Sequence, residues 1–313
     1  MGSDDASDKP GCALAVKPGC LGVVGGASVG PQRVNFSILP TPTSQGGSGV
    51  ITEGEDNMQL SDYQDKYHGI RFTRDAAGVL EMTIHTRGGP ALWGTSLKSL
   101  HAELGHAFRD VAHDYENKVV ILTGTGDSFI TAMDAEEQFH EPSLAAMWPR
   151  IQDEGQALLT NLLAIPVPMI AAVNGPALIH AELAVLCDIV LAADSAVFAD
   201  LAHVPGGAVP GDGVHTVWPM LLGPNRGRYF LLTGERIGAE EARRLGVVGE
   251  VLGADALLPR AHALAAQLAQ MPAVMLRHTR AVLVRELRRR MFDELSNGLA
   301  HEGLAMLCPP PGS

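Results

Sequence analysis

The segment His203–Gly213 carries the residue types with the greatest capacity for chemistry. It reads HVPGGAVPGDG and combines one histidine and one aspartate with four glycines and two prolines. Glycines let the backbone approach a ligand or adopt positive φ, and prolines stiffen the remainder. A carboxylate bonded to one ring nitrogen of a histidine fixes its tautomer and strengthens the other nitrogen as a base. We therefore predict that Asp212 polarises His203 as a general base; a rigid connector is the alternative interpretation.

A second histidine, His180, lies where a short apolar strand passes into a helix. The run PMIAAV (168–173) precedes it, and the stretch NGPALIHAELAVLCD (174–188) surrounds it. A single histidine is more often structural than catalytic, so its role depends on its neighbours. His180 is accordingly either a packing residue at the turn or a side-chain donor in a site.

The pattern of apolar residues predicts the elements that must position these side chains. Alternation of apolar and polar residues on both sides of the turn Ala76–Gly78 predicts a β-hairpin. Short runs made almost wholly of apolar residues are typical of strands buried on both faces of a parallel sheet. They cover residues 118–124, 168–173 and 188–193. Helical patterns at 99–114 and about 145–165 alternate with them, which indicates repeated βαβ units, and beyond Gly211 the chain is mainly helical.

Length and charge bound the class of protein. The 313 residues, 46% of them hydrophobic, suffice for one large core domain with appendages or for two small domains. A net charge of −12 argues against a nucleic-acid-binding surface, which needs clustered lysine and arginine. No run approaches the ~18 apolar residues of a membrane span. We expect a protein that binds neither nucleic acid nor membrane.

The termini and cysteines indicate the compartment. The acidic opening MGSDDASDKP is unlike a secretory signal or a mitochondrial transit peptide, so we expect a cytoplasmic protein. The cysteines are scattered without a C-x-x-C pair, which indicates neither a zinc site nor a disulfide framework. They are Cys12, Cys20, Cys187 and Cys308.

Composition divides the chain into three regions. Residues 1–57 are rich in Gly, Ser and Pro and poor in aromatics, so we predict a mostly disordered tail, either a regulatory arm or upstream sequence included by gene calling. Residues 58–250 are predicted to form an α/β core, and residues 251–313 a helical region. The run RELRRR (285–290) in that last region is interpreted as a solvated helix face or a subunit contact.

Four blocks of the sequence resemble the signature blocks of the crotonase (enoyl-CoA hydratase/isomerase) superfamily, in the same order and roughly the same spacing. They are TGTGDSFITAMD (123–134), IAAVNGPA (170–177), ELAVLCDIVLAA (182–193) and VPGDG (209–213). The resemblance covers about residues 68–308. It implies a spiral of ββα units with two nearly perpendicular sheets, a C-terminal helical trimerisation region, and homotrimers that often pair into hexamers (dimers of trimers). It also implies an enolate held by two backbone N–H groups, here near Met133 and His180.

The departures from the common pattern of that superfamily argue against hydration of a CoA thioester. CoA-using members carry glycines where this chain has Leu178, Ile179 and His180. Hydratases use two glutamates; the first matches Glu182, whereas the second falls at Ala202 or His203. The early motif that helps to hold CoA also differs, since it reads GPAL followed by a tryptophan.

These departures are similar to the β-diketone hydrolase branch typified by 6-oxocamphor hydrolase. The matching stretches include the start of the helix at 101–104, the whole of 203–213, the run 218–234 and LAHE at 299–302. The resemblance implies a polar site made of His101, His180, the His203–Asp212 pair, Glu302 and Trp93.

The reaction implied by this branch is the retro-Claisen cleavage of a cyclic 1,3-diketone to a keto acid, without a metal or other cofactor. A bicyclic diketone is the expected kind of substrate. His203 polarised by Asp212 would be the base, and His180 with the Trp93 indole N–H would hold the enolate oxygen. The proton would return to the enolate carbon through Asp212. His101 and Glu302 would form a second polar pair; the alternative is that they anchor the C-terminal helix.

Two other functions remain open at this point. The extra residues Thr95–Leu100, between Trp93 and His101, have no counterpart in the branch and could move a pocket wall. They leave room for a crotonase-type cyclase or lyase that acts on a non-CoA natural-product intermediate. A scaffold or RNA-binding paralogue is the third reading, and the acidic charge and the intact polar set argue against it.

Overall fold

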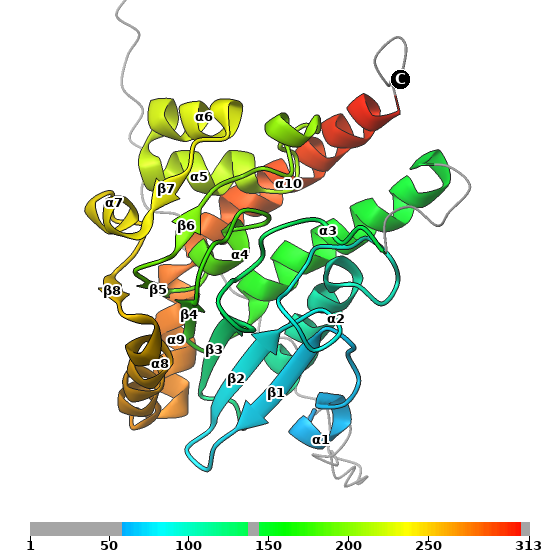
Figure 1. The fold of residues 1–313 in the computed structure, drawn as a ribbon. Coiled ribbons are helices and arrows are strands. Elements are labelled where there is room, and N and C mark those ends of the chain that lie inside the picture. Colours follow the sequence, from blue (N-terminus) through cyan, green and yellow to red (C-terminus); the bar gives the residue numbers. More distant parts are fainter. Residues whose placement is uncertain (1–57, 137–143, 308–313) are drawn as a thin grey trace, which may run out of the picture. The chain divides into compact units, whose positions relative to one another are not determined.

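The computed structural model describes residues 58–136 and 144–307, so the predicted tail over 1–57 lies outside the described residues. The main sheet has six strands in the order β1-β2-β3-β4-β5-β8 (Figure 1). All neighbouring strands are parallel except the first pair, which is antiparallel. The strands are β1 (Ile70–Arg74), β2 (Val79–Ile84), β3 (Val119–Gly124), β4 (Met169–Val173), β5 (Ile189–Ala193) and β8 (Glu250–Leu252).

The predicted hairpin is confirmed as β1 and β2. Asp75 closes its turn, because its Oδ1 accepts hydrogen bonds of 2.9 Å from the backbone N–H groups of both Ala77 and Val79. Gly78 has φ +84° and would place a Cβ 2.6 Å from the Glu116 carbonyl oxygen, so this turn requires glycine.

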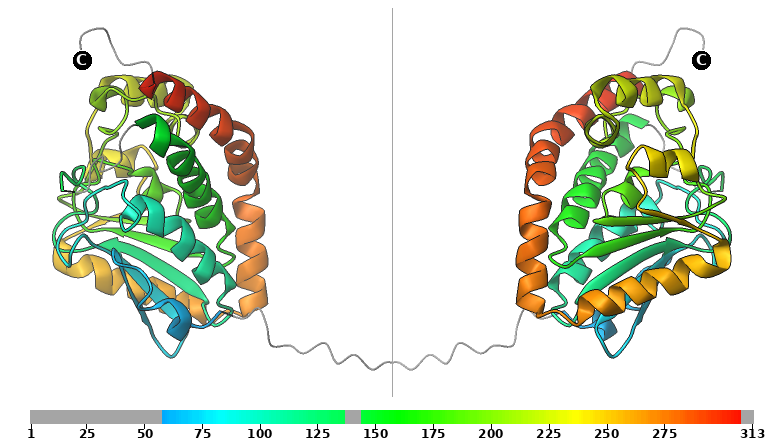
Figure 2. Two further views of the ribbon diagram at one scale, coloured as in Figure 1. Left: turned by 90° about the vertical axis from the view of Figure 1, so that its right-hand side faces the viewer. Right: turned by 90° about the vertical axis from the view of Figure 1, so that its left-hand side faces the viewer.

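Helices cover both faces of the sheet, as the apolar strands predicted. Every residue of β3 and β4 is buried. Val120 and Leu122 of β3 pack in one hydrophobic cluster with Phe108 of α2 (Leu100–His113), while Ile121 packs in another with Leu257 of α8 (Ala254–Ala269). Figure 2 shows α2 and α3 (Leu144–Ala164) on one side of the sheet and α8 on the other. The predicted boundary near residue 250 stays a prediction.

The chain returns from each strand of the main sheet through a second, smaller layer. Isolated parallel bridges join Trp93 to Met133, Ile130 to Ala177 and Ala177 to Phe198. The last of these leads into β6 (Val197–Phe198), which pairs with β7 (Ile237–Gly238). Successive turns of the chain thus add one strand to the main sheet and one extended segment to the second layer, which is the predicted spiral of ββα units.

The remaining elements are helical, as predicted beyond Gly211. They are α1 (Leu60–Tyr63), α4 (Glu182–Val185), the short 3-10 turn η1 (Val204–Gly206), α5 (Val214–Leu222), α6 (Pro224–Thr233), α7 (Ala239–Arg244), α9 (Ala273–Leu283) and α10 (Arg285–Met306). The long C-terminal helix α10 packs against both α3 and α5 (Figure 1). Among the described residues, no helix is long and apolar enough to cross a membrane.

Candidate active site

His180 adopts a backbone conformation that favours glycine. Its φ is +50°, and the residue precedes Ala181, the N-cap of the single-turn helix α4. Such a conformation costs an L-residue roughly 1–2 kcal/mol. Non-glycine residues in strained conformations persist where the surroundings hold them, and they cluster at functional sites. The sequence suggested that relatives carry glycine here, and the positive φ explains why glycine suits the turn.

Three buried histidines each bond to a carboxylate through Nδ1. The His180 ring donates to Glu182 Oε1 at 2.7 Å, and the His203 ring donates to Asp200 Oδ1 at 2.6 Å. His101 is 2.9 Å from Glu154 Oε2. Two of these bonds are local in the sequence and the third joins α2 to α3; each fixes the orientation of its ring.

Asp212 lies between two of these rings. Its Oδ2 is 3.1 Å from His180 Nδ1, and its Oδ1 is 3.2 Å from His203 Nε2. The contact to His203 does not reach hydrogen-bond geometry, so within the described part of the chain Oδ1 is a buried oxygen without a hydrogen-bond partner. An unpaired buried carboxylate oxygen is available to a water molecule or to a substrate.

A close contact between two glycines brings Glu302 to this cluster. A Cβ on Gly211 would lie 2.3 Å from the carbonyl oxygen of Gly298 on α10, and 2.8 Å from the Cβ of Glu302. The backbone of the Gly/Pro-rich segment therefore touches α10 directly, next to Asp212. The glycine serves helix packing here rather than the approach of a ligand. Glu302 is itself buried, and its Oε2 has no hydrogen-bond partner among the described residues.

All seven residues predicted for the site line one cavity. Its volume is about 110 Å³. The predicted residues are Trp93, His101, Met133, His180, His203, Asp212 and Glu302, and the remaining walls come from Thr95, Trp148, Ile151, Ala202, Ala208, Leu299 and Met306. Ligand sites for drug-sized molecules measure roughly 300–1,000 Å³. The cavity therefore fits a compact ligand that contacts most of its walls.

The structure brings His203 and Asp212 together as predicted, but Asp212 faces Nε2 at 3.2 Å, whereas Asp200 holds Nδ1 at 2.6 Å and orients the ring. The predicted pairing of His101 with Glu302 is wrong, because His101 bonds to Glu154 on α3. Asp200 is a local partner three residues before His203, whereas Glu154 reaches His101 through tertiary packing.

Two backbone N–H groups at the cavity lack an acceptor within the described ranges. They belong to Met133 and His180, the positions expected to hold an enolate oxygen. Met133 is held by a parallel bridge to Trp93, whose ring stacks on that of His180 with centroids 3.8 Å apart. This stacking links the two donor positions through one aromatic side chain.

The electrostatics of the cluster separate its groups into charged and neutral ones. Burial opposes the charge of each ring, yet the carboxylates of Glu182 and Asp212 raise the pKa of His180 to about 10. Asp212 and Asp200 likewise hold the pKa of His203 well above its ordinary value despite burial. Both rings are therefore imidazolium ions at neutral pH.

The two carboxyl groups that line the cavity, those of Asp212 and Glu302, behave in opposite ways. Burial works to raise the pKa of Asp212, but the charged rings of His203 and His180 hold it well below its ordinary value. Burial, reinforced by the charge of Asp212, raises the pKa of Glu302 to about 8. Two carboxyl groups whose pKa values are pushed apart are typical of an acid and a base that share a site.

The same cluster contains donor atoms that suit a metal ion. One nitrogen of His180 and one oxygen each of Glu182 and Asp212 lie within 4.8 Å of one another. In the structure these atoms face each other directly, through the contacts of 2.7 and 3.1 Å given above.

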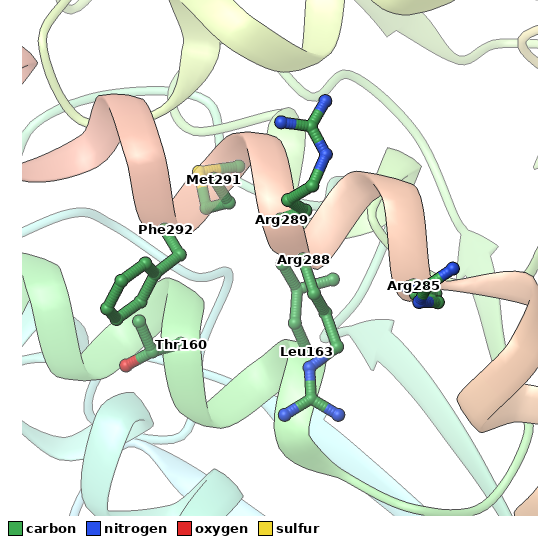
Figure 3. A pocket seen from close by; sticks show the side chains of 7 residues that line it. All are labelled: Thr160, Leu163, Arg285, Arg288, Arg289, Met291 and Phe292. Carbon is green, nitrogen blue, oxygen red and sulfur yellow. The ribbon is translucent and has the colours of Figure 1, made fainter. Parts of the chain in front are cut away.

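A larger hollow of about 340 Å³ lies apart from these residues, between α3 and α10 (Figure 3). Its walls carry three arginines and no carboxylate or histidine. Arg288 and Arg289 point to opposite sides of α10 in Figure 3, and Arg289 is paired with Glu286 and Asp293. The smaller cavity, rather than this hollow, holds the groups that can exchange protons.

Similarity to known proteins agrees with this architecture. A sequence model of the enoyl-CoA hydratase/isomerase family matches residues 74–299. The carnitinyl-CoA dehydratase of Citrobacter koseri is 38% identical over 203 residues, which are 64% of this chain and 74% of that protein.

Two solved structures are also similar. One is a β-diketone hydrolase from the cyanobacterium Anabaena, bound to (S)-3-oxocyclohexyl acetic acid; it is 42% identical, with a TM-score of 0.74 over 77% of this chain and 95% of the other. The second is an enoyl-CoA hydratase/isomerase from Mycobacterium paratuberculosis, 26% identical, with a TM-score of 0.71 over 78% and 95% of the two chains. The chain therefore belongs to the enoyl-CoA hydratase/isomerase family and is a crotonase-fold enzyme.

Proposed function

We propose that this enzyme hydrolyses a carbon–carbon bond of a cyclic 1,3-diketone, of the bicyclic kind, to give a keto acid. The observation that carries the proposal is the Asp212 carboxylate, which lies between the charged rings of His180 and His203 at a small cavity and whose Oδ1 has no hydrogen-bond partner among the described residues. The reaction itself requires a base for water, donors for an enolate oxygen and a proton source for carbon.

In the first step Asp212 accepts a proton from water while the water oxygen bonds to one carbonyl carbon. General base catalysis of this kind typically contributes 10²–10⁴ in rate. His203 is charged in the resting enzyme, so its role is to position and stabilise the carboxylate, and Asp200 orients the ring. The base of this proposal is therefore Asp212 rather than His203.

In the second step the tetrahedral adduct collapses and the carbon–carbon bond breaks. Its electron pair passes to the neighbouring carbonyl, which becomes an enolate. The backbone N–H groups of Met133 and His180, together with His180 Nε2–H, are available to the enolate oxygen, since none has an acceptor within the described part of the chain. Donors fixed in advance at the position of a developing charge stabilise the transition state without reorganisation.

In the third step Asp212 returns its proton to the enolate carbon. The low pKa of Asp212 makes the carboxylate a weak base, so its proton transfer from water must accompany the bonding of the water oxygen to carbon; the same low pKa favours release of the proton to carbon. The proton taken from water ends on carbon, and the hydroxyl ends in the new carboxyl group. The atoms therefore balance without an oxidant, a reductant or a metal.

The ligand of the Anabaena β-diketone hydrolase supports this substrate class. It is a cyclohexanone that carries an acetic acid arm. Joining the carboxyl carbon of such an acid to a ring carbon beside the ketone, with loss of water, gives a bicyclic 1,3-diketone. We infer a compact substrate of the same kind for the cavity of this enzyme.

Hydrolysis in H₂¹⁸O tests the proposal. Wild-type enzyme is incubated with a panel of cyclic and bicyclic 1,3-diketones, and loss of the diketone absorbance identifies the substrates. We expect one labelled oxygen in the carboxylate of the product. A product without label would favour a cyclase or lyase. Hydration of crotonyl-CoA at an ordinary hydratase rate would contradict the proposal.

We propose a cytoplasmic homotrimer, or a hexamer formed from two trimers. Large apolar side chains exposed on the C-terminal helices support an interface there: Val274, Met275, Val282, Leu283, Phe292 and Leu304. Sedimentation of the purified protein measures the number of subunits.

Replacing Glu302 by Gln is expected to change the pH dependence more than the maximal rate. Glu302 is protonated below its pKa of about 8, so it can donate a hydrogen bond to the carbonyl that water attacks. In the wild type kcat/KM should fall above about pH 8, as Glu302 ionises. The Gln side chain keeps an N–H donor and does not ionise. In the Gln variant the decrease of kcat/KM at alkaline pH should therefore move from about pH 8 toward the pKa of His180, about 10.

The pH profile of the variant decides the role of Glu302. An unchanged alkaline limb near pH 8 would show that another group sets it. Loss of all activity at every pH would show that Glu302 transfers a proton, which a hydrogen-bond donor does not.

A further inference from the structure

The loop between Trp93 and α2 brings a hydroxyl group into the cavity that the mechanism above does not use. Thr95 lines the cavity, and its Oγ1 is buried without a hydrogen-bond partner in the ranges described. A buried polar group left unpaired costs ~1–3 kcal/mol. Valine would fill the same space without that cost, and the hydroxyl group is free to bond to a polar ligand that enters the cavity.

The loop holds Thr95 firmly in this position. Ser99 Oγ lies 2.6 Å from the carbonyl oxygen of Gly94 and 2.7 Å from that of Ser96, so its one hydroxyl hydrogen is shared between them and closes the loop on itself. Arg150 on α3 donates to the Thr95 carbonyl oxygen at 3.0 Å. The backbone of Thr95 is thus held from both sides, which places its side chain at the cavity before a ligand binds.

Arg150 also connects this loop to the histidines of the site. Its Nη1 bonds to both oxygens of Glu154, at 2.9 and 3.0 Å, and Glu154 in turn bonds to His101. The chain of contacts from Thr95 to His101 gives these two cavity residues a common support on α3.

The two oxygens of a 1,3-diketone need separate donors. Met133 and His180 supply those for the oxygen that becomes the enolate. The other carbonyl oxygen carries negative charge once water has added, and Glu302 is so far its only donor. An anionic oxygen in a cavity this small is stabilised strongly by each additional fixed donor.

We propose that Thr95 Oγ1 donates a hydrogen bond to the carbonyl oxygen that water attacks, and that it forms with Glu302 a second donor pair. The inference rests on the proposed function. As the water oxygen bonds to carbon, the π electrons of the carbonyl move to its oxygen, and the Thr95 hydroxyl stabilises them there. When the adduct collapses the C=O bond reforms, and the hydroxyl is left bonded to the new carboxyl group.

Thr95→Val, measured beside Thr95→Ser, tests the proposal. Val has the shape of Thr but no hydroxyl, and we expect kcat to fall about 10²-fold with KM little changed, because the bond strengthens in the transition state. Ser keeps the hydroxyl and should retain most of kcat. Thr216→Val is the matched control: Thr216 Oγ1 is also buried and unpaired, but it lies on α5 outside the cavity. Its kcat should equal that of the wild type.

The outcomes separate this inference from the proposed function. Diketone hydrolysis by the wild type, with Thr95→Val turning over at the same rate, overturns the inference and leaves the function intact. A rise in KM alone also overturns it, because the hydroxyl would then act on the ground state. If the wild type hydrolyses no diketone, both the proposed function and the role of Thr95 are contradicted. Thermal unfolding checks each variant, and Thr95→Ala replaces Thr95→Val if the valine protein does not fold.

Discussion

Asp212→Asn is expected to lower kcat by about 10³-fold or more while leaving the protein folded. Asn has the same shape but neither accepts a proton from water nor returns one to carbon. A positioned general base contributes 10²–10⁴ in rate, and this carboxylate serves in two steps. The measurement is steady-state turnover of the diketone identified by the panel. Circular dichroism and thermal unfolding establish that the variant is intact.

Asp200→Asn is the matched control for this prediction, because both aspartates contact the ring of His203. Asp200 is buried and bonds to Nδ1, but it does not line the cavity. If Asp212 is the base, the Asp200 variant should lose less activity, since it only weakens the orientation of the ring. A greater loss for Asp200→Asn than for Asp212→Asn would return the role of base to a neutral His203. Turnover of Asp212→Asn within tenfold of the wild type would exclude Asp212.

The order of elements could be predicted because local patterns are strong in this chain. The apolar runs that form β3, β4 and β5 are buried on both faces. Such strands can be predicted from their continuous apolar residues alone. Seven of the residues that line the cavity could also be predicted, because the resemblance supplied them in chain order; the other walls, such as Thr95 and Trp148, could not. Blocks far apart in the sequence meet at one point only through the spiral of the fold.

The partners of the histidines could not be predicted in the same way. Glu154 lies 53 residues from His101 on a helix with no other chemical signal, and only the packing of α3 against α2 brings them together. Asp200 did leave a signal, since it stands three residues before His203 at the end of a short strand. The sequence instead indicated Asp212 as the partner of His203, because both residues lie in one segment rich in glycine and proline. The charge states of the site residues could not be predicted from the sequence either, because they depend on burial and on neighbouring charges in the folded protein.

His180→Ala and His180→Gly are both expected to lower kcat by 10²–10³-fold, yet to differ in stability. Each removes the imidazolium donor, and loss of one such donor typically costs this much in turnover. Each also leaves Glu182 buried without its partner, so that cost cancels between the two. The φ of +50° remains strained with Ala and is relaxed with Gly. The Gly variant should therefore be more stable than the Ala variant by ~1 kcal/mol.

This pair separates the chemical role of His180 from a packing role. Chemical denaturation gives the difference in unfolding free energy, and turnover is measured on the same preparations. If His180 only packs at the turn, activity should follow stability, and Gly should restore much of what Ala loses. If the ring donates to the enolate, the two variants should be equally slow while their stabilities differ. The strain stored at His180 then has a function, since it holds a side-chain donor where the turn itself favours glycine.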